Sequence, residues 1–474
     1  MPISAPLSSK PWPHWLALAF LPCAAWAGPS TAASSAQVAI PAQWQAETPA
    51  GALDTAALVQ WWKRFDDPAL EQLVDTSLRQ SPTIRTALSR IAAARAARNI
   101  ERAGLLPSIN AGASGSGTRT TVRKTDVTTT TESYGASLDA SWEIDLFGKQ
   151  SLALTAAQAD LAQTTESLHA AQVSLAAEVA TAYVTLRSTE AQLAALEASV
   201  AAQNETTQVA RWREQAGLVS GLDAQQAVAA LEQARASLPS LRQTLTETRN
   251  KLATLCGRAP GELDTILATA RPLPAVPATL AVGIPAETLR QRPDIRAAER
   301  GFEAALARRK SAQRDRLPSL TLTGSLGVES LKAGDIFSPE RNLARLVGSL
   351  TAPIFAGGRI SAAIAVKTES ERQALIAYEA AVLAALAEVE NAQSAVVRTS
   401  ERLDSLTLAA AAAREAASLA AQKYQAGEAD MLTALDAQRT SLSLDQQQVA
   451  AAAARLTAHI QLYKSLGGGW STTP

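Results

Sequence analysis

The sequence predicts an α+β protein built from two similar halves, each combining very long helices with one β-hairpin. Two runs, 149–216 and 359–426, contain neither Pro nor Gly and are rich in strong helix formers such as Ala, Leu, Glu and Arg. Short motifs of the first half return in the second half at nearly constant spacing. Between the helical segments, apolar and polar residues alternate, which is the period of a β-strand.

The two long runs set the scale of the molecule, because a helix of that length spans roughly 100 Å. Apolar residues make up 47% of the sequence but aromatic residues only 4%, so the apolar surface is mostly small and favours close packing of helices. The formal net charge is zero, which argues against a nucleic-acid partner. The chain has three His and two Cys, and their spacing resembles neither a metal site nor a nucleophile with its base. We therefore expect a rod or tube with no catalytic residue, metal or cofactor.

The N-terminus reads as an export leader. An apolar stretch, 15–22, precedes Ala25-Trp26-Ala27, which has the pattern of a signal-peptidase site. Residues 1–27 are therefore expected to be a signal peptide. Lipidation at Cys23 is the alternative, although Pro22 directly before it fits a lipoprotein signal poorly. No later stretch has 18 continuous apolar residues, so no transmembrane helix is predicted.

The chain repeats itself over most of its length. Residues 78–85, LRQSPTIR, return at 289–296 as LRQRPDIR, a spacing of 211 that also joins Leu106-Pro107-Ser108 to Leu317-Pro318-Ser319. Gly217 and Gly427 are 210 residues apart. The later pair Leu222–Gln225 and Leu435–Gln438 is offset by 213, which predicts an insertion of three residues after the second glycine. A period this long indicates a duplicated half-molecule, because solenoid repeats are far shorter.

Each half has the same order of elements. A helix begins at Pro82 or Pro293, since Pro suits the first helical turn, and ends near 104 or 316. A hairpin follows, with polar loops expected at about 119–131 and 329–344. The long helix then leads to the glycine turn, and a second helix returns over 222–256 or 431–466. Placed end to end, the pre-hairpin and return helices are nearly as long as one long helix. Each half would therefore supply two full-length columns to the wall of a tube: the long helix, and the two shorter helices in line. Pro239 is expected either to bend the first return helix or to lie where that helix departs from the tube.

The hairpins carry the clearest alternation. Ser133–Asp145 places apolar residues, including Trp142, on one face and polar residues on the other, and 320–329 repeats the pattern. Weaker versions occur at 108–118 and 346–354. A half-buried soluble sheet is one explanation, and an outer-membrane barrel is the other. Because small barrels need about eight strands, four strands require several chains to close one.

Three segments outside this scheme are expected to form a belt around the middle of the tube. The domain organisation expected is therefore a signal peptide (1–27), an N-terminal equatorial segment (28–67), a first repeat (68–256, hairpin about 107–146), a Pro-rich equatorial linker (257–285), a second repeat (286–466, hairpin about 318–355) and a C-terminal tail (467–474).

The mature chain resembles the TolC-type outer membrane efflux channels, of the OprM/NodT lipoprotein branch. The motifs that carry the resemblance are WWKRFDDP (61–68), LPS (106–108), WEIDLFG (142–148), LRQRPDIR (289–296), PIFAGGR (353–359) and QAG (425–427). The resemblance implies a homotrimer in the cell outer membrane, with a twelve-stranded β-barrel continuing into a long periplasmic α-helical barrel. It also implies a periplasmic adaptor protein and an inner-membrane pump of the RND type as partners. The function implied is the passive exit of drugs or other small molecules.

The resemblance further implies a gate at the periplasmic tip, near the helix turns. Its positions in this sequence are Lys423, Tyr424 and Asp436, with Asp223 as the first-half counterpart of Asp436. Three copies would place a ring of carboxylates at the narrowest point, where it would attract cations. The structural alternative is that Asp223 and Asp436 simply favour helix N-termini.

Other functions remain open at this point. A channel for protein secretion or metal export would have the same fold, although the chain lacks the His and Met clusters of a soft-metal site. A trimeric coiled-coil stalk or adhesin would show heptads along the whole rod and a single membrane anchor. The matched hairpins of the two halves argue against such a stalk.

Overall fold

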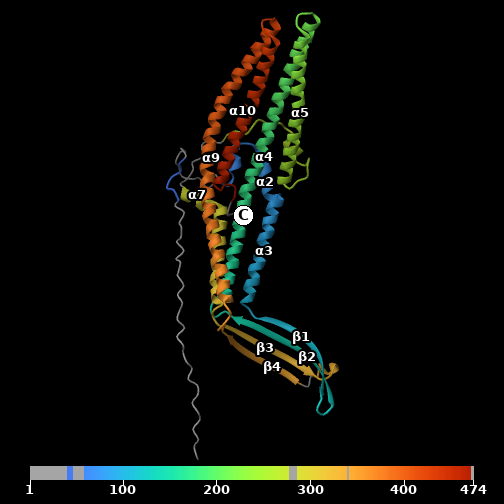
Figure 1. The fold of residues 1–474 in the computed structure, drawn as a ribbon, viewed down its shortest axis with the longest axis vertical. Coiled ribbons are helices and arrows are strands. Elements are labelled where there is room, and N and C mark those ends of the chain that lie inside the picture. The colour runs from blue at the N-terminus through green and yellow to red at the C-terminus, as the bar shows by residue number, and fades with distance from the viewer. Residues whose placement is uncertain (1–39, 46–57, 277–284, 339–340, 471–474) are drawn as a thin grey trace, which may run out of the picture. The chain divides into compact units, whose positions relative to one another are not determined.

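The computed structural model describes residues 40–45, 58–276, 285–338 and 341–470. The expected signal peptide and Cys23 lie outside these residues. Figure 1 shows the elements, which in chain order are η1 (Trp61–Phe65), α2 (Pro68–Gln80), α3 (Pro82–Gly104), β1 (Ser108–Val122), β2 (Val127–Ile144), α4 (Lys149–Gln215), α5 (Gly221–Leu255), α6 (Asp264–Leu267), α7 (Pro285–Gln291), α8 (Pro293–Arg314), β3 (Ser319–Ser330), η2 (Ala333–Asp335), β4 (Arg341–Thr351), α9 (Arg359–Ala426) and α10 (Met431–Ser465).

The two long helices form as predicted. α4 has 67 residues and α9 has 68, and each is followed by a glycine with positive φ, Gly217 or Gly427. Glycine takes this left-handed conformation without steric cost, so it ends the helix. By length and composition, α9 contains an 18-residue window apolar enough to cross a membrane, with mean hydropathy 1.2, but only 28% of that window is buried within the chain. The abundance of alanine in α9 accounts for this hydropathy.

Shorter helices pack along the two long helices, two beside each. In Figure 1, α3 and α5 follow one another along α4, and α8 and α10 do the same beside α9. α8 also packs on α4 and so joins the two halves. Pro239 lies inside α5, which continues through it from Gly221 to Leu255.

The four strands form one antiparallel sheet in the order β1-β2-β3-β4. β2 pairs with β3, so the hairpins of the two halves lie side by side. The predicted loops were too long: β1 runs to Val122 and β2 begins at Val127. Threonines occupy much of the paired ends, and Thr121 and Thr128 hydrogen bond across them at 3.0 Å. β-branched threonine favours strands, but a polar run shows no alternation that would reveal one.

An aromatic core joins the N-terminal segment to the end of the chain at the middle of the helices. The Trp61 ring stacks on Tyr463 of α10, with centroids 5.2 Å apart, and contacts Trp62 and Phe65 edge-on. The Gly469 N–H donates to the Leu58 carbonyl at 2.9 Å. The described part of the tail is therefore packed into this core.

The motif at 61–68 also ends in a helix cap. The Asp67 carboxylate accepts the Ala69 N–H at 2.9 Å and so caps α2, whose first residue is Pro68. The same carboxylate accepts the Tyr183 hydroxyl at 2.7 Å. Burial and this hydrogen bond raise the pKa of Tyr183 to about 12, so the hydroxyl remains a donor at neutral pH. Asp67 thus fixes the N-terminal segment to the middle of α4.

Candidate functional site

The two helix turns furthest from the sheet are built alike. Gly217 is followed by the N-cap Ser220, and Gly427 is followed by the N-cap Asp430, so both turns have the same length. The three additional residues expected after the second glycine therefore do not lengthen the turn itself. The matching Leu-Asp-Ala-Gln motif of the second half instead lies about one turn deeper in its helix.

Asp223 and Asp436 consequently occupy different positions. Asp223 is the third residue of α5 and forms a capping box with Ser220. Its carboxylate therefore has the structural role that helix N-termini favour. Asp436 lies in the second turn of α10, 63% exposed, with its carboxylate 3.9 Å from Arg439. Of the two carboxylates, only that of Asp223 caps the start of its helix.

Each glycine turn joins two antiparallel helices into a helical hairpin, α4–α5 in the first half and α9–α10 in the second. Tyr424 is buried between these two helical hairpins. It is 3% exposed and packs with apolar residues of three other helices, α4, α5 and α10: Ala210, Ala227, Ala230, Met431, Ala434 and Leu435. Burial raises the pKa of the phenol, and the nearby charge of Arg213 opposes that rise. Within the described residues, the Tyr424 hydroxyl has no hydrogen-bond partner. Lys423, the residue before it, is exposed.

Arg213 is the tip residue that the sequence reading missed. It lies in the last turn of α4, and its Nη1 donates to the backbone carbonyl of Tyr424 at 2.6 Å. Its Cζ lies 5.1 Å from the centre of the Tyr424 ring, within range of a cation–π contact. A cation at this point also interacts favourably with the C-terminal end of the α9 dipole. Arg213 therefore joins the helical hairpin α4–α5 directly to the helical hairpin α9–α10.

A signal for Arg213 was present in the sequence. Arg213 lies four residues before Gly217, as Lys423 lies four residues before Gly427. Basic residues in the last turn of a helix commonly bind its free carbonyls. The duplication therefore pairs Arg213 with Lys423, although only the structure shows that Arg213 reaches the other hairpin.

The opposite end of the long helices meets the sheet, where the motif at 142–148 explains the junction. The Trp142 indole N–H donates to the Leu105 carbonyl at 3.0 Å. The N-cap of α4 is Gly148, which has no side chain, so the Asp145 carboxylate accepts the N–H groups of Gln150 and Ser151 instead. The motif thus holds the β-hairpin to α3 and starts α4.

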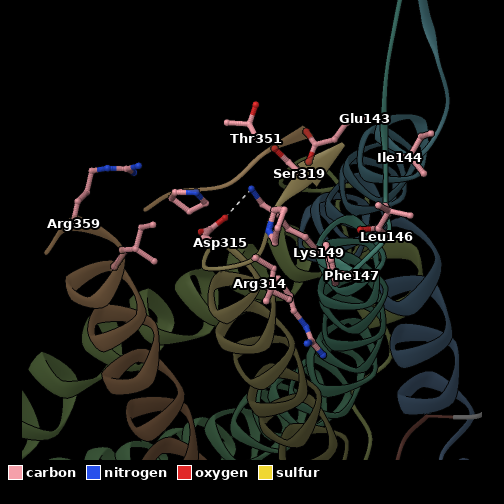
Figure 2. Close-up of a pocket in the computed structure, with 16 residues that line it drawn as sticks. Glu143, Ile144, Leu146, Phe147, Lys149, Arg314, Asp315, Ser319, Thr351 and Arg359 are labelled. Atoms are coloured by element: carbon pink, nitrogen blue, oxygen red, sulfur yellow. Dashed lines mark ion pairs between the residues drawn. The ribbon is translucent and has the colours of Figure 1, made fainter. Parts of the chain in front are cut away.

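A cavity of about 450 Å³ lies at this junction, lined by residues of both halves. Figure 2 shows the Lys149 ammonium and the Asp315 carboxylate pointing toward one another across it, 2.8 Å apart. The pair ties the start of α4 to the end of α8. Arg359, the first residue of α9, also lines the cavity. Figure 2 draws no ion pair between Arg359 and the other lining residues. The second-half residues Ile354 and Phe355, next to this site, are 99% and 90% exposed.

Among the residues that the structure describes, no group of three or more His, Cys, Asp or Glu side chains could hold a metal ion. The described cysteine, Cys256, is buried, and burial raises the pKa of its thiol to about 11, which leaves it protonated and unreactive at neutral pH.

Comparison with known proteins places these features in context. A family model described as "Outer membrane efflux protein" matches residues 73–258 and 284–468. The chain is 32% identical to the probable efflux pump outer membrane protein TtgC of Pseudomonas putida over 445 residues, 91% of this chain and 90% of the relative. It is 31% identical to the pyoverdine export outer membrane protein OpmQ of Pseudomonas aeruginosa over 456 residues, covering 94% of each chain.

Solved structures agree with these sequence relatives. The outer-membrane channel OprN is 35% identical with a TM-score of 0.82, covering 91% of this chain and 99% of that one. The open state of the Neisseria gonorrhoeae MtrE outer membrane channel is 30% identical with a TM-score of 0.77, covering 91% and 96%.

Proposed function

The chain belongs to the outer membrane efflux protein family, and we infer that it is the outer membrane exit duct of a tripartite efflux pump. The observation that carries this function is that each half of the chain combines one β-hairpin with one very long helix. The two hairpins form a single four-stranded sheet, and the two helices have 67 and 68 residues. The sheet provides the wall of a membrane barrel, and the helices extend that wall by roughly 100 Å into the periplasm. The stalk or adhesin alternative does not account for this sheet.

We propose that three copies close the barrel. In the described chain, β1 and β4 each have one edge without a strand partner, and four strands are too few to close a barrel. Three copies supply twelve strands. Native mass spectrometry of the detergent-solubilised protein is expected to give three times the mass of the mature chain, and planar bilayers should show a conducting channel. A folded monomer without conductance would refute the duct.

We further propose an adaptor protein in the periplasm and an inner-membrane pump of the RND type as partners. The duct itself is expected to be unselective among small molecules. Relatives of nearly equal identity carry names that refer to toluene, antibiotics and pyoverdine. Substrates so different, conducted by such similar ducts, favour selection in the pump and passive passage through the duct. None of these names refers to protein secretion.

Asp223, Lys423, Tyr424 and Asp436 are proposed to lie at the periplasmic gate. Exposure of Asp436 and the burial of Tyr424 between hairpins support different roles: Asp436 supplies charge, whereas Tyr424 supplies packing. Asp223 holds the start of α5, and Lys423 faces away from its own chain's core.

Replacing Asp436→Asn is expected to lower the cation preference of the channel, because three carboxylates leave the narrow end of the duct. The reversal potential of single channels in a salt gradient measures this preference. Asp404→Asn is the matched control, since Asp404 is an exposed carboxylate of α9 well away from the turn. Equal shifts in both variants would contradict the placement of Asp436 at the constriction.

A further inference from the structure

The apolar face of the sheet has an uncharged band between two aromatic side chains. Trp142 and Tyr134 lie on this face of β2, and between them on the same face are Ala140, Leu138 and Ala136. This length of strand spans about 26 Å, since each residue adds about 3.3 Å. At the tilt of barrel strands, that is roughly 20 Å along the membrane normal, close to the height of a lipid-facing band. In the proposed duct, Trp142 therefore marks the periplasmic interface and Tyr134 the outer one.

Arg119 lies on the same face, just beyond the outer interface. It pairs in the ladder with Thr130, four residues past Tyr134 along β2. A Cβ added at Gly115 would lie 3.4 Å from the Tyr134 ring, so Gly115 and Tyr134 share a face. Side chains alternate along a strand, so Arg119, four residues further along β1, lies on that face too. Its long side chain can reach back to the level of the lipid headgroups.

The charge of Arg119 is not paired within the described part of the chain. Arg119 has no hydrogen-bond or ion-pair partner among the described residues, whereas Arg341 on the polar face has Glu329 directly opposite it in the ladder. Among the described strand residues, the apolar face has one other charged side chain, Glu132, one row nearer the membrane. The Glu132 carboxylate accepts the Tyr134 hydroxyl at 3.4 Å. Arg119 is therefore open to an anion at the outer membrane surface.

The turn of the first hairpin adds positive charge beside Arg119. Residues 123–126, between β1 and β2, read RKTD, two cations and one carboxylate. β2 pairs with β3 only as far as Tyr134 and Ser330, so the hairpin end that carries Arg119 and this turn extends past the rest of the sheet. The outer rim of the hairpin therefore carries a net positive charge, even with Glu132 included.

On the membrane side of Arg119, the apolar face is hollowed by a cavity of about 590 Å³. The lining side chains on this face form two rows across β2, β3 and β4: Leu138, Leu326 and Ala344 in one, and Ala136, Val328 and Asn342 in the other. Between this level and Arg119, the residues of β1 on the apolar face are Ala113, Gly115 and Gly117. No large side chain of β1 therefore separates the cation from the apolar cavity.

We propose that Arg119 binds a phosphate of lipid A, the phosphorylated glycolipid of the outer leaflet, and that an acyl chain of the same molecule lies against the apolar cavity. A guanidinium group binds phosphate through two parallel hydrogen bonds. Lipid A carries phosphates at headgroup level and acyl chains below them, which matches the order of cation and cavity on this face. The inference rests on the proposed duct, which places the hairpin turn outside the cell, and adds a specific lipid site.

Native mass spectrometry of the delipidated, detergent-solubilised full chain, titrated with bisphosphorylated lipid A, tests the site. Arg119→Gln is expected to raise the apparent Kd at least fivefold, and Arg119→Lys by less, because lysine keeps the charge but loses the two-point contact. Arg341→Gln is the matched control, since it removes an arginine from the polar face near the same end of the sheet. Glu132→Gln is expected to tighten binding, because it removes a negative charge from the same face as the phosphate.

Two further lipids identify the group that is bound. Dephosphorylated lipid A is expected to bind weakly and equally to the wild type and to Arg119→Gln. Phosphatidylglycerol, with a single phosphate diester, is expected to bind more weakly than lipid A. If phosphatidylglycerol binds as tightly as lipid A and loses as much affinity in Arg119→Gln, the assignment to lipid A is wrong.

Equal affinity of the wild type and Arg119→Gln for lipid A, or an equal loss in Arg341→Gln, would overturn the site. The same preparations give the oligomeric mass and the conductance in planar bilayers. A conducting trimer whose lipid binding ignores Arg119 refutes the lipid site alone. A monomer without conductance would instead refute the duct on which the inference rests.

Discussion

Replacing Arg213→Gln is expected to raise single-channel conductance, because it removes the contact that holds the two helical hairpins of a chain together. Arg213 donates to the Tyr424 carbonyl at 2.6 Å and covers the Tyr424 ring. Hydrogen bonds from charged groups contribute about 1.5–3 kcal/mol each. If the proposed gate opens by separating the hairpins, the loss favours the open tip by about tenfold or more for each copy, since 1.4 kcal/mol is a factor of ten.

The matched control for this variant is Arg211→Gln. Arg211 is an exposed arginine of the same helical turn, and the change removes the same charge without the contact. Arg213→Lys tests the geometry, because lysine keeps the charge but lacks the planar group that both donates and stacks. We expect the highest conductance for Arg213→Gln, an intermediate conductance for Arg213→Lys, and the wild-type conductance for Arg211→Gln. Wild-type conductance in Arg213→Gln would contradict the role of this residue.

Tyr424→Phe is expected to have a smaller effect than Arg213→Gln in the same recording. The contact from Arg213 goes to the Tyr424 backbone and ring, both of which phenylalanine keeps. The hydroxyl finds no partner among the described residues of the chain. A large effect of Tyr424→Phe would therefore indicate a partner for the hydroxyl in a neighbouring copy.

Trp61→Ala is expected to lower the free energy of unfolding by about 3–5 kcal/mol, the usual cost of removing a large buried side chain. Trp61 is fully buried and stacks on Tyr463, so its loss opens a cavity between the N-terminal segment and α10. Denaturant titration of the solubilised protein, followed by far-UV circular dichroism of the helices, measures the change.

Trp212→Ala is the matched control for that variant, because Trp212 is 60% exposed and its removal leaves no cavity. Its effect on stability should stay within about 0.5 kcal/mol. If the two variants unfold at the same denaturant concentration, the aromatic core does not stabilise the helices.

Much of the architecture could be predicted from local sequence. Alanine-rich runs without Pro or Gly predicted α4 and α9 almost to the residue, because helix propensity and helix-ending glycines act over a few positions. Alternation found the strands, but it missed the threonine-rich ends of the first hairpin, where no apolar face marks the period. The repeated motifs identified the duplication, but they misplaced Asp436 relative to Asp223 by one helical turn.

The sequence by itself therefore determined the helices, the hairpins, their duplication and the family resemblance. Only the tertiary structure decided which distant residues meet: β2 with β3, Asp67 with Tyr183, and Arg213 with the Tyr424 carbonyl 211 positions away. Secondary structure follows from interactions between near neighbours, whose pattern is written in the local order of residues. Contacts between distant segments depend on how whole helices pack, because a shift of one helical turn brings a different side chain to the same place.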